Sequence, residues 1–216
     1  MPLYSKLSLY IEGMQPRQRN TAIGRPPGEG DFWVFAYGSL MWRPDFPSID
    51  CQPALLRGYH RALRVESIHY RGVPGLPGLV LGLDRGGSCR GRAYRVAPAE
   101  IEAVMAYLDE RELITGVYRR AHLPIRLPGT TVVAAAYLVN RDHDQYTGKL
   151  SLNETVAMVL QGHGPTGSAR DYLRHTVAHL DDLGIREGAL RRIFAAVEAE
   201  AAERDKRDRT RDETAR

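Results

Sequence analysis

Short apolar runs and alternations fill the middle of the chain and predict a sheet. Residues 34–36 form an apolar run directly before a Tyr-Gly pair, which predicts a buried strand that ends at a glycine. Further strands are predicted at residues 54–65 (one or two strands), 91–96 (after a turn at Gly86-Gly87), 118–127 and 131–139. Residues 72–78 contain five glycines and prolines in seven positions, which predicts an irregular loop.

Helical spacing interrupts this β-rich part once and then dominates the rest. Pro98 begins a segment in which Ile101, Val104, Met105 and Leu108 recur at i, i+3, i+4 and i+7. Three later helices are predicted from a capping box at Ser151 and Glu154, from a cap at Ser168 with Asp171, and from the apolar stripe that starts at Leu190. Beyond Glu198 the charges alternate, which predicts either a solvated helix extension or disorder. The pattern indicates an α+β protein with a helical C-terminal part.

The 216 residues are enough for one well-buried domain. We expect residues 31–200 to form it, residues 1–30 to be a partly flexible N-terminal extension, and residues 201–216 to be a charged tail. A Pro- and Gly-rich stretch at 25–30 predicts the linker between extension and domain. Residues 3–11 have enough apolar character for an edge strand or a partner contact.

The charge balance argues against a nucleic-acid partner. The net charge of +4 comes from 30 basic and 26 acidic residues that are interleaved, without a basic stripe. No apolar run is long enough to span a membrane, and no secretory signal is evident, so we expect a cytoplasmic protein. Cys51 and Cys89 have no metal-ligand spacing and suit a reduced compartment, although a single disulfide remains open.

The turn after the first strand is a candidate binding site. Its run reads Val34, Phe35, Ala36, Tyr37, Gly38, Ser39, Leu40. A glycine lets the backbone turn sharply, and consecutive N–H groups in such a turn can form a concave cradle for an anion. We interpret the turn as a cradle for a carboxylate or an oxyanion, with a plain strand-to-loop connection as the alternative.

Glu112 is the candidate acid or base. It lies eleven positions after Ile101, which on a continuous helix returns to within about 20° of the same direction. Glu112 should therefore point toward the core, whereas Glu110 should point to solvent. Desolvation would raise the pKa of this carboxyl toward a range useful for proton transfer. The alternatives are that Glu112 is a buried partner for an arginine, or that the helix ends at Leu108.

Other candidate groups have weaker support. His175 and His179 share a helix face, as a metal pair would, but no third ligand accompanies them. Ser39 as a hydrolase nucleophile lacks both a Gly-x-Ser-x-Gly context and an obvious His and Asp. We therefore expect neither a metal site nor a nucleophilic serine.

Five segments in one order carry a family resemblance. They are Val34-Phe35-Ala36-Tyr37-Gly38-Ser39-Leu40-Met41-Trp42, Tyr70-Arg71-Gly72-Val73-Pro74-Gly75-Leu76-Pro77-Gly78, Gly91-Arg92-Ala93-Tyr94-Arg95-Val96, Tyr107-Leu108-Asp109-Glu110-Arg111-Glu112 with Tyr118, and Gly164-Pro165-Thr166-Gly167 with Asp171-Tyr172-Leu173. Together they resemble the ChaC-type γ-glutamylcyclotransferases over residues 32 to 200. This chain departs from the family pattern at Ala36, at residues 63–68 and at residues 113–117, which bears on substrate range.

The resemblance implies a fold and an activity. The fold would be a compact, mixed β-barrel-like core flanked by helices. The activity would be cleavage of a γ-glutamyl amide, typically that of glutathione, to 5-oxoproline and cysteinylglycine, with Glu112 as the catalytic residue and no metal or organic cofactor. Tyr37 and Tyr137 are candidates for lining the pocket, and Arg71 for meeting a substrate carboxylate; ordinary packing and a surface role are the alternatives.

Two rival functions stay open at this point. One is a cyclotransferase that acts on other γ-glutamyl amines or amino acids. The other is a non-catalytic protein that binds and senses γ-glutamyl compounds. The sequence leaves the oligomeric state open.

Overall fold

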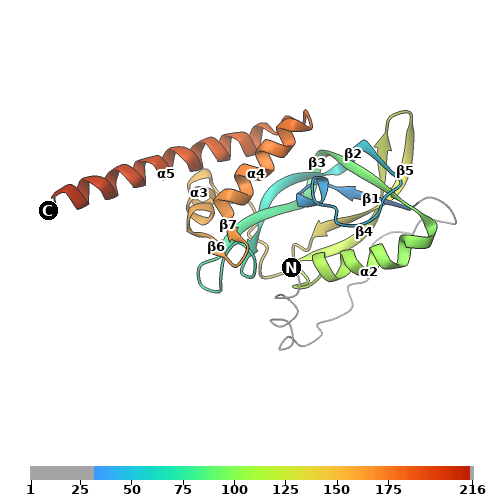
Figure 1. Cartoon of the computed structure of the whole chain (residues 1–216), viewed down its shortest axis with the longest axis horizontal. Coiled ribbons are helices and arrows are strands. Elements are labelled where there is room, and N and C mark those ends of the chain that lie inside the picture. The colour runs from blue at the N-terminus through green and yellow to red at the C-terminus, as the bar shows by residue number, and fades with distance from the viewer. Residues whose placement is uncertain (1–31, 215–216) are drawn as a thin grey trace.

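β1 closes a five-stranded barrel because both of its edges are paired. The computed structural model describes residues 32–214; the predicted extension 1–30, its suggested edge strand at 3–11 and residues 215–216 lie outside them. The barrel order is β1-β3-β2-β4-β5, and β1 also pairs with β5 in parallel (Figure 1). The barrel confirms the predicted α+β fold with a barrel-like core and flanking helices.

The helices and strands occur in the following order along the chain. They are β1 (Phe32–Ala36), a 3-10 turn (Ser39–Met41), β2 (Asp50–Ser67), β3 (Gly78–Val96), a 3-10 turn (Pro98–Glu100), α2 (Ile101–Glu112), β4 (Tyr118–Leu127), β5 (Thr130–Val139), α3 (Leu152–Gln161), β6 (His163–Gly164), β7 (Gly167–Ser168), α4 (Ala169–Asp182) and α5 (Gly188–Thr214).

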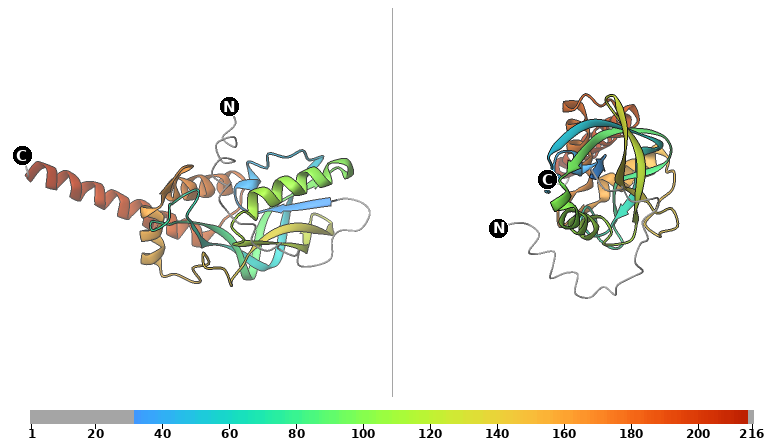
Figure 2. Two further views of the ribbon diagram at one scale, coloured as in Figure 1. Left: turned by 90° about the horizontal axis from the view of Figure 1, so that it is seen from below. Right: turned by 90° about the vertical axis from the view of Figure 1, so that its right-hand side faces the viewer.

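The two longest strands connect the barrel to the helices. β2 and β3 pair antiparallel from Asp50 opposite Arg95 to Ser67 opposite Gly78. One end of this ribbon belongs to the barrel, and the other end packs against α3 and α4 (Figures 1 and 2). The loop 68–77 therefore lies at the helical end of the molecule, far along the ribbon from Asp50.

The sequence misplaced the boundaries of both long strands. The segment predicted as residues 54–65 is the single, longer β2. The turn predicted at Gly86-Gly87 is wrong, because β3 runs through both glycines from Gly78 to Val96. Both have positive φ, and the register shifts opposite them between Arg57 and Tyr59, as in a bulge.

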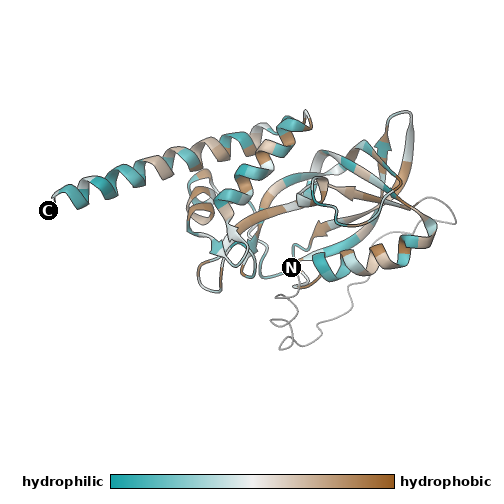
Figure 3. Ribbon diagram, viewed as in Figure 1, coloured by the Kyte–Doolittle hydropathy of each residue, from teal (hydrophilic) through white to brown (hydrophobic). Residues whose placement is uncertain are grey.

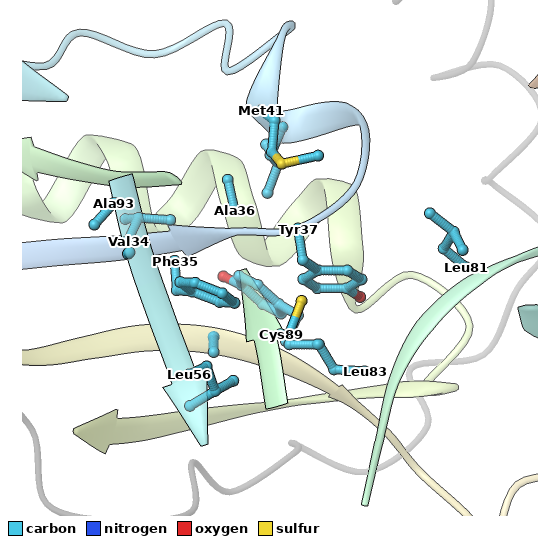
Figure 4. Packing of buried hydrophobic residues seen from close by; sticks show 14 of the residues in the cluster. Val34, Phe35, Ala36, Tyr37, Met41, Leu56, Leu81, Leu83, Cys89 and Ala93 are labelled. Carbon is cyan, nitrogen blue, oxygen red and sulfur yellow. The ribbon is translucent and has the colours of Figure 1, made fainter. Parts of the chain in front are cut away.

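β1 is the most completely buried strand. Phe32 and Trp33 are nearly inaccessible, and Val34, Phe35 and Ala36 are fully so. Figure 4 shows Val34, Phe35, Ala36 and Tyr37 following one another along β1 into the turn, with Met41 beyond it. A strand that is paired on both edges and buried on both faces reads as a continuous apolar run, which is the pattern at residues 32–36.

The helices largely agree with the predicted signals. The capping box at Ser151 and Glu154 is present at the start of α3, and the Ser168 side chain accepts a hydrogen bond from the Asp171 N–H at the start of α4. α5 continues to Thr214, so its charged end is the helix extension, and Figure 3 shows this part as hydrophilic throughout. No helix within residues 32–214 combines the length and apolarity that a membrane crossing requires.

Gly91 lets the end of β1 approach β3. A Cβ at this position would lie 2.2 Å from the Ala36 carbonyl oxygen and 2.9 Å from the Phe35 ring. Since real Cβ atoms do not come this close to backbone, Gly91→Ala should push the end of β1 away from β3. We expect a loss of about 1–3 kcal/mol in the free energy of unfolding, measured by urea denaturation.

The control for this prediction is Gly188→Ala at the start of α5. A Cβ there meets its nearest atom, on Arg192, at 3.8 Å, which is ordinary contact. Unfolding of Gly91→Ala at the same urea concentration as Gly188→Ala would contradict the prediction.

Candidate active site

The turn after β1 presents N–H groups without acceptors. Gly38 follows β1 by two residues and caps the 3-10 turn Ser39–Met41, in which the Met41 N–H donates to the Gly38 carbonyl at 2.9 Å. The first N–H groups of a helical turn have no partner inside it. Among residues 32–214, no acceptor takes the N–H of Gly38, Ser39 or Leu40. The turn therefore has the N–H donors that an anion cradle requires, and the cradle itself stays a prediction.

The strand residues before the turn have a different place. The side chains of Val34, Phe35 and Ala36 fill the barrel core, and Tyr37 and Leu40 are also buried. We therefore restrict the binding hypothesis to the backbone of Gly38, Ser39 and Leu40, which follows the core-packed residues of the strand.

Glu112 is the last residue of α2. The helix extends through this position, so the predicted continuation past Leu108 is confirmed. Its side chain is 18% exposed, whereas Glu110 lies on the exposed face of the helix. Burial raises the pKa of Glu112 above its ordinary value of 4.5, and the charge of Arg111 opposes this shift. The carboxyl thus has the partly desolvated state that the helical spacing predicts.

Arg111 joins Glu112 to the turn. Its Nε lies 3.2 Å from Glu112 Oε1, and its Nη2 donates to Ser39 Oγ at 3.0 Å. The same guanidinium donates to the Arg43 carbonyl at 3.0 Å and to the Tyr107 hydroxyl at 2.8 Å. The alternative in which Glu112 pairs with an arginine is therefore also realised, and that arginine fixes the carboxyl beside the cradle.

Three tyrosines lie near Glu112: Tyr37 is buried, and Tyr118 and Tyr172 are partly buried. Burial raises the pKa of Tyr37 and of Tyr118 well above 10 and that of Tyr172 to about 12, and the charge of Glu112 raises all three pKa values further. Tyr118 donates to the Leu81 carbonyl at 2.5 Å, and the Leu81 N–H approaches the Tyr172 hydroxyl at 3.4 Å. These phenols stay protonated near neutral pH, so they act as hydrogen-bonding groups and not as bases.

Tyr172 also faces the cradle. A Cβ on Gly38 would lie 3.8 Å from the Tyr172 hydroxyl. The guanidinium of Arg71 lies 5.6 Å from the Tyr172 ring centroid, and its Nη1 donates to the Thr166 carbonyl at 2.5 Å. Burial lowers the pKa of Arg71, with an additional lowering from Arg43. Arg71 thus extends from the loop 68–77 toward Tyr172 of α4, the tyrosine that faces the turn.

Close glycine contacts hold this loop against the segment between α3 and α4. A Cβ on Gly162 would lie 2.2 Å from the Gly78 Cα, and one on Gly164 would lie 2.4 Å from the Tyr70 carbonyl oxygen. The Thr166 N–H and hydroxyl both donate to the Tyr70 carbonyl, at 3.1 and 2.8 Å. The second and last resembling segments therefore form one packed unit that positions Arg71 and Tyr172.

Tyr137 lies outside the cradle. It is 1% exposed, and its hydroxyl donates to Asp109 Oδ1 at 2.9 Å, while Asp109 Oδ2 accepts from Arg120 at 2.5 Å. Its side chain is therefore packed in the barrel, which was the alternative to lining the pocket. The charge of Glu112 still contributes to the raised pKa of Tyr137.

The other candidates have partners that account for them. Ser39 Oγ bonds Arg111, and the ring of His179 stacks on Trp42 with centroids 4.4 Å apart while its Nδ1 bonds the His175 carbonyl. Within residues 32–214 no group of three or more His, Cys, Asp or Glu side chains could hold a metal ion. Cys51 and Cys89 are both free thiols, so the open disulfide does not form.

Solved structures define the class of this fold. A yeast protein described as a γ-glutamyl cyclotransferase specific to glutathione superposes with a TM-score of 0.72 over 78% of this chain and 96% of that chain, at 20% identity. The barrel with its flanking helices is thus the γ-glutamylcyclotransferase fold.

Sequence comparisons give the family. The family model described as ChaC-like protein matches residues 32–200. The glutathione-specific gamma-glutamylcyclotransferase of Escherichia coli K12 is 32% identical, covering 82% of this chain and 77% of its own length. Glutathione-specific gamma-glutamylcyclotransferase 1 of Homo sapiens is 31% identical over 68% of this chain and 70% of its own length. The chain belongs to the ChaC-like protein family, which confirms the resemblance.

The raised pKa of Glu112 predicts a pH-dependent stability difference. Because the folded state binds this proton more tightly than the unfolded chain, the wild type loses stability as the pH rises from 4.5 through the raised pKa. Glu112→Gln cannot ionise, so at pH 7 it should unfold at a higher urea concentration than the wild type. This advantage should disappear below about pH 4, where the wild-type carboxyl is protonated in both states.

Glu110→Gln removes one negative charge from the exposed face of the same helix and serves as the control. A Glu112→Gln variant that is less stable than the wild type at pH 7 would mean that the ion pair with Arg111 outweighs desolvation.

Proposed function

We propose that this protein cleaves the γ-glutamyl amide of glutathione to 5-oxoproline and cysteinylglycine. The observation that carries the proposal is the link from Glu112, through Arg111, to the turn whose N–H groups lack acceptors among residues 32–214. A carboxyl with a raised pKa and an anion cradle are thereby held in one fixed relation. The curated relatives named above carry this activity in their names.

The chemistry needs one proton carrier and no protein nucleophile. The α-amine of the γ-glutamyl group attacks its own γ-carbonyl carbon, which forms the five-membered ring, and the amide C–N bond then breaks. The attacking amine must lose a proton, and the leaving amine must gain one. Glu112 takes the first proton and returns it to the leaving nitrogen, so the carboxyl ends as it began. General acid–base help of this kind is typically worth about 10²- to 10⁴-fold.

The turn supplies the second requirement, which is a folded substrate. The γ-glutamyl chain has several rotatable bonds, and ring closure needs its amine held against its γ-carbonyl. N–H groups of Gly38, Ser39 and Leu40 would bind the α-carboxylate or the carbonyl oxygen, and a carbonyl oxygen bound there gains negative charge in the transition state. The cradle therefore lowers the entropy cost of cyclisation and stabilises the charge that develops.

The neighbouring side chains suit this role. Tyr172 is neutral near pH 7 and faces Gly38, so it can donate or accept a hydrogen bond without competing for the catalytic proton. Arg71 and Arg43 bring two positive charges to the same side of the site. Glutathione carries two carboxylates, and Arg71 is our candidate partner for the one that the cradle does not hold. A cytoplasmic location remains our expectation from the sequence.

Product analysis tests the proposal directly. Incubation of the purified protein with glutathione should release equal amounts of 5-oxoproline and free cysteinylglycine, detected by mass spectrometry. γ-Glutamyl-alanine in a parallel assay tests the broader cyclotransferase alternative, and it should be a poorer substrate. Binding without either product, seen by calorimetry, would instead support a sensing role and refute the proposed enzyme.

Glu112→Gln should abolish this release. The amide cannot carry the proton, so we expect kcat/KM to fall by at least about 10²-fold while the fold is retained. Glu110→Gln is the matched control on the exposed face of α2 and should change kcat/KM less than about twofold. Activity of Glu112→Gln within a few-fold of wild type would remove Glu112 from the mechanism, and an equal loss in both variants would point to helix damage.

A further inference from the structure

Arg61 is a buried cation on the inward face of β2. Its side chain is 0% exposed, and it alternates in phase with the buried Leu63 and Val65. A guanidinium cannot shed its charge by losing a proton, so at this position it needs partners on every side. The acceptors of its N–H groups therefore show what holds this buried charge in place.

Each edge of the guanidinium has a defined acceptor. Nε donates to the Tyr37 carbonyl at 2.5 Å, and Nη2 donates to the Arg90 carbonyl at 2.7 Å. Nη1 forms an ion pair with Glu187, whose own carbonyl accepts the Arg191 N–H in the first turn of α5. These three interactions lie on different edges of the planar guanidinium, so together they fix its position.

The bond to Tyr37 bears directly on the cradle. The carbonyl belongs to the peptide unit whose N–H is that of Gly38, and this peptide is trans. In a planar trans peptide the C=O and the N–H point in opposite directions. Holding the Tyr37 oxygen toward Arg61 therefore aims the Gly38 N–H away from Arg61, and a cation on the carbonyl also polarises the amide and makes its N–H a stronger donor.

We propose that Arg61 is a positioning residue that fixes and polarises the Tyr37–Gly38 peptide so that the Gly38 N–H is presented to the substrate. The inference rests on the proposed function for its effect on rate, but its geometric part concerns the free protein. Glu187 compensates the buried charge, and it thereby connects the first turn of α5 to the turn after β1.

Two variants test the inference. Arg61→Lys keeps the charge but cannot bind both carbonyls and Glu187 in one plane. The double variant Arg61→Met with Glu187→Leu removes the pair without leaving an unpaired buried charge, a change that proteins often tolerate. Asp84→Asn is the matched control, since Asp84 is also buried and its side chain bonds Arg64, Arg141 and Tyr146.

The first measurement needs no activity. In ¹⁵N-labelled protein, the amide of Gly38 reports on the hydrogen bond to the preceding carbonyl. Its nitrogen shift should change in both Arg61 variants and not in Asp84→Asn. An unchanged Gly38 amide in a folded double variant overturns the proposal whatever the rates are.

The second measurement is kcat/KM for cysteinylglycine release at a temperature where all variants are folded. A small change in the direction of the Gly38 N–H should lower kcat/KM by about 10- to 100-fold in both Arg61 variants. Asp84→Asn should lose stability and keep kcat/KM within about twofold. A double variant with wild-type kcat/KM, or an equal loss in Asp84→Asn, refutes a positioning role. If the wild type itself releases no cysteinylglycine, the proposed function fails, and the Gly38 amide alone decides the role of Arg61.

Discussion

The pairing of β1 on both edges is the constraint on which the rest of the structure depends. Five residues of apolar strand close the barrel between β3 and β5, so the strand cannot slide without breaking two ladders. Its end at Ala36 is fixed for the same reason, and the turn that follows begins two residues later, at Gly38. The proposed cradle would thus extend from the most buried strand of the fold, and a pre-formed cradle would limit the conformational entropy that substrate binding must remove.

Desolvation and the ion pair with Arg111 shift the pKa of Glu112 in opposite directions, and the proposed chemistry depends on their balance. Complete burial without a partner would hold the carboxyl protonated and prevent it from accepting a proton. Full exposure would leave its pKa near 4.5, too low to take a proton from an ammonium group efficiently. Arg111 moderates the effect of burial, so the pKa is raised but remains opposed by a cation. The same arginine holds Ser39, which couples the electrostatics of the acid to the position of the cradle.

Local patterns predicted part of this arrangement. The apolar run at residues 34–36 predicted the buried first strand, which begins at Phe32 in the structure. The helical period placed Glu112 on the partly buried face and Glu110 on the exposed one. Both predictions depend only on neighbours along the chain. Gly86-Gly87 misled the strand assignment, since a pair of glycines supplies positive φ equally to a turn and to a bulge. Sequence alone cannot tell these apart without the partner strand, whose register shift shows the bulge.

The positions of Arg61 and Tyr172 relative to the turn follow only from tertiary structure. Arg61 did leave a signal, because an arginine in phase with Leu63 and Val65 on an alternating strand is anomalous. Its acceptors, however, lie just after β1, within β3 and in the segment before α5, which are distant in sequence. The proposed proton carrier is one residue on one helix, whereas the orientation of the Tyr37–Gly38 peptide depends on bonds from an arginine that three separate segments surround. The partly buried carboxyl was therefore open to sequence reasoning, and the arrangement of the turn beside it was not.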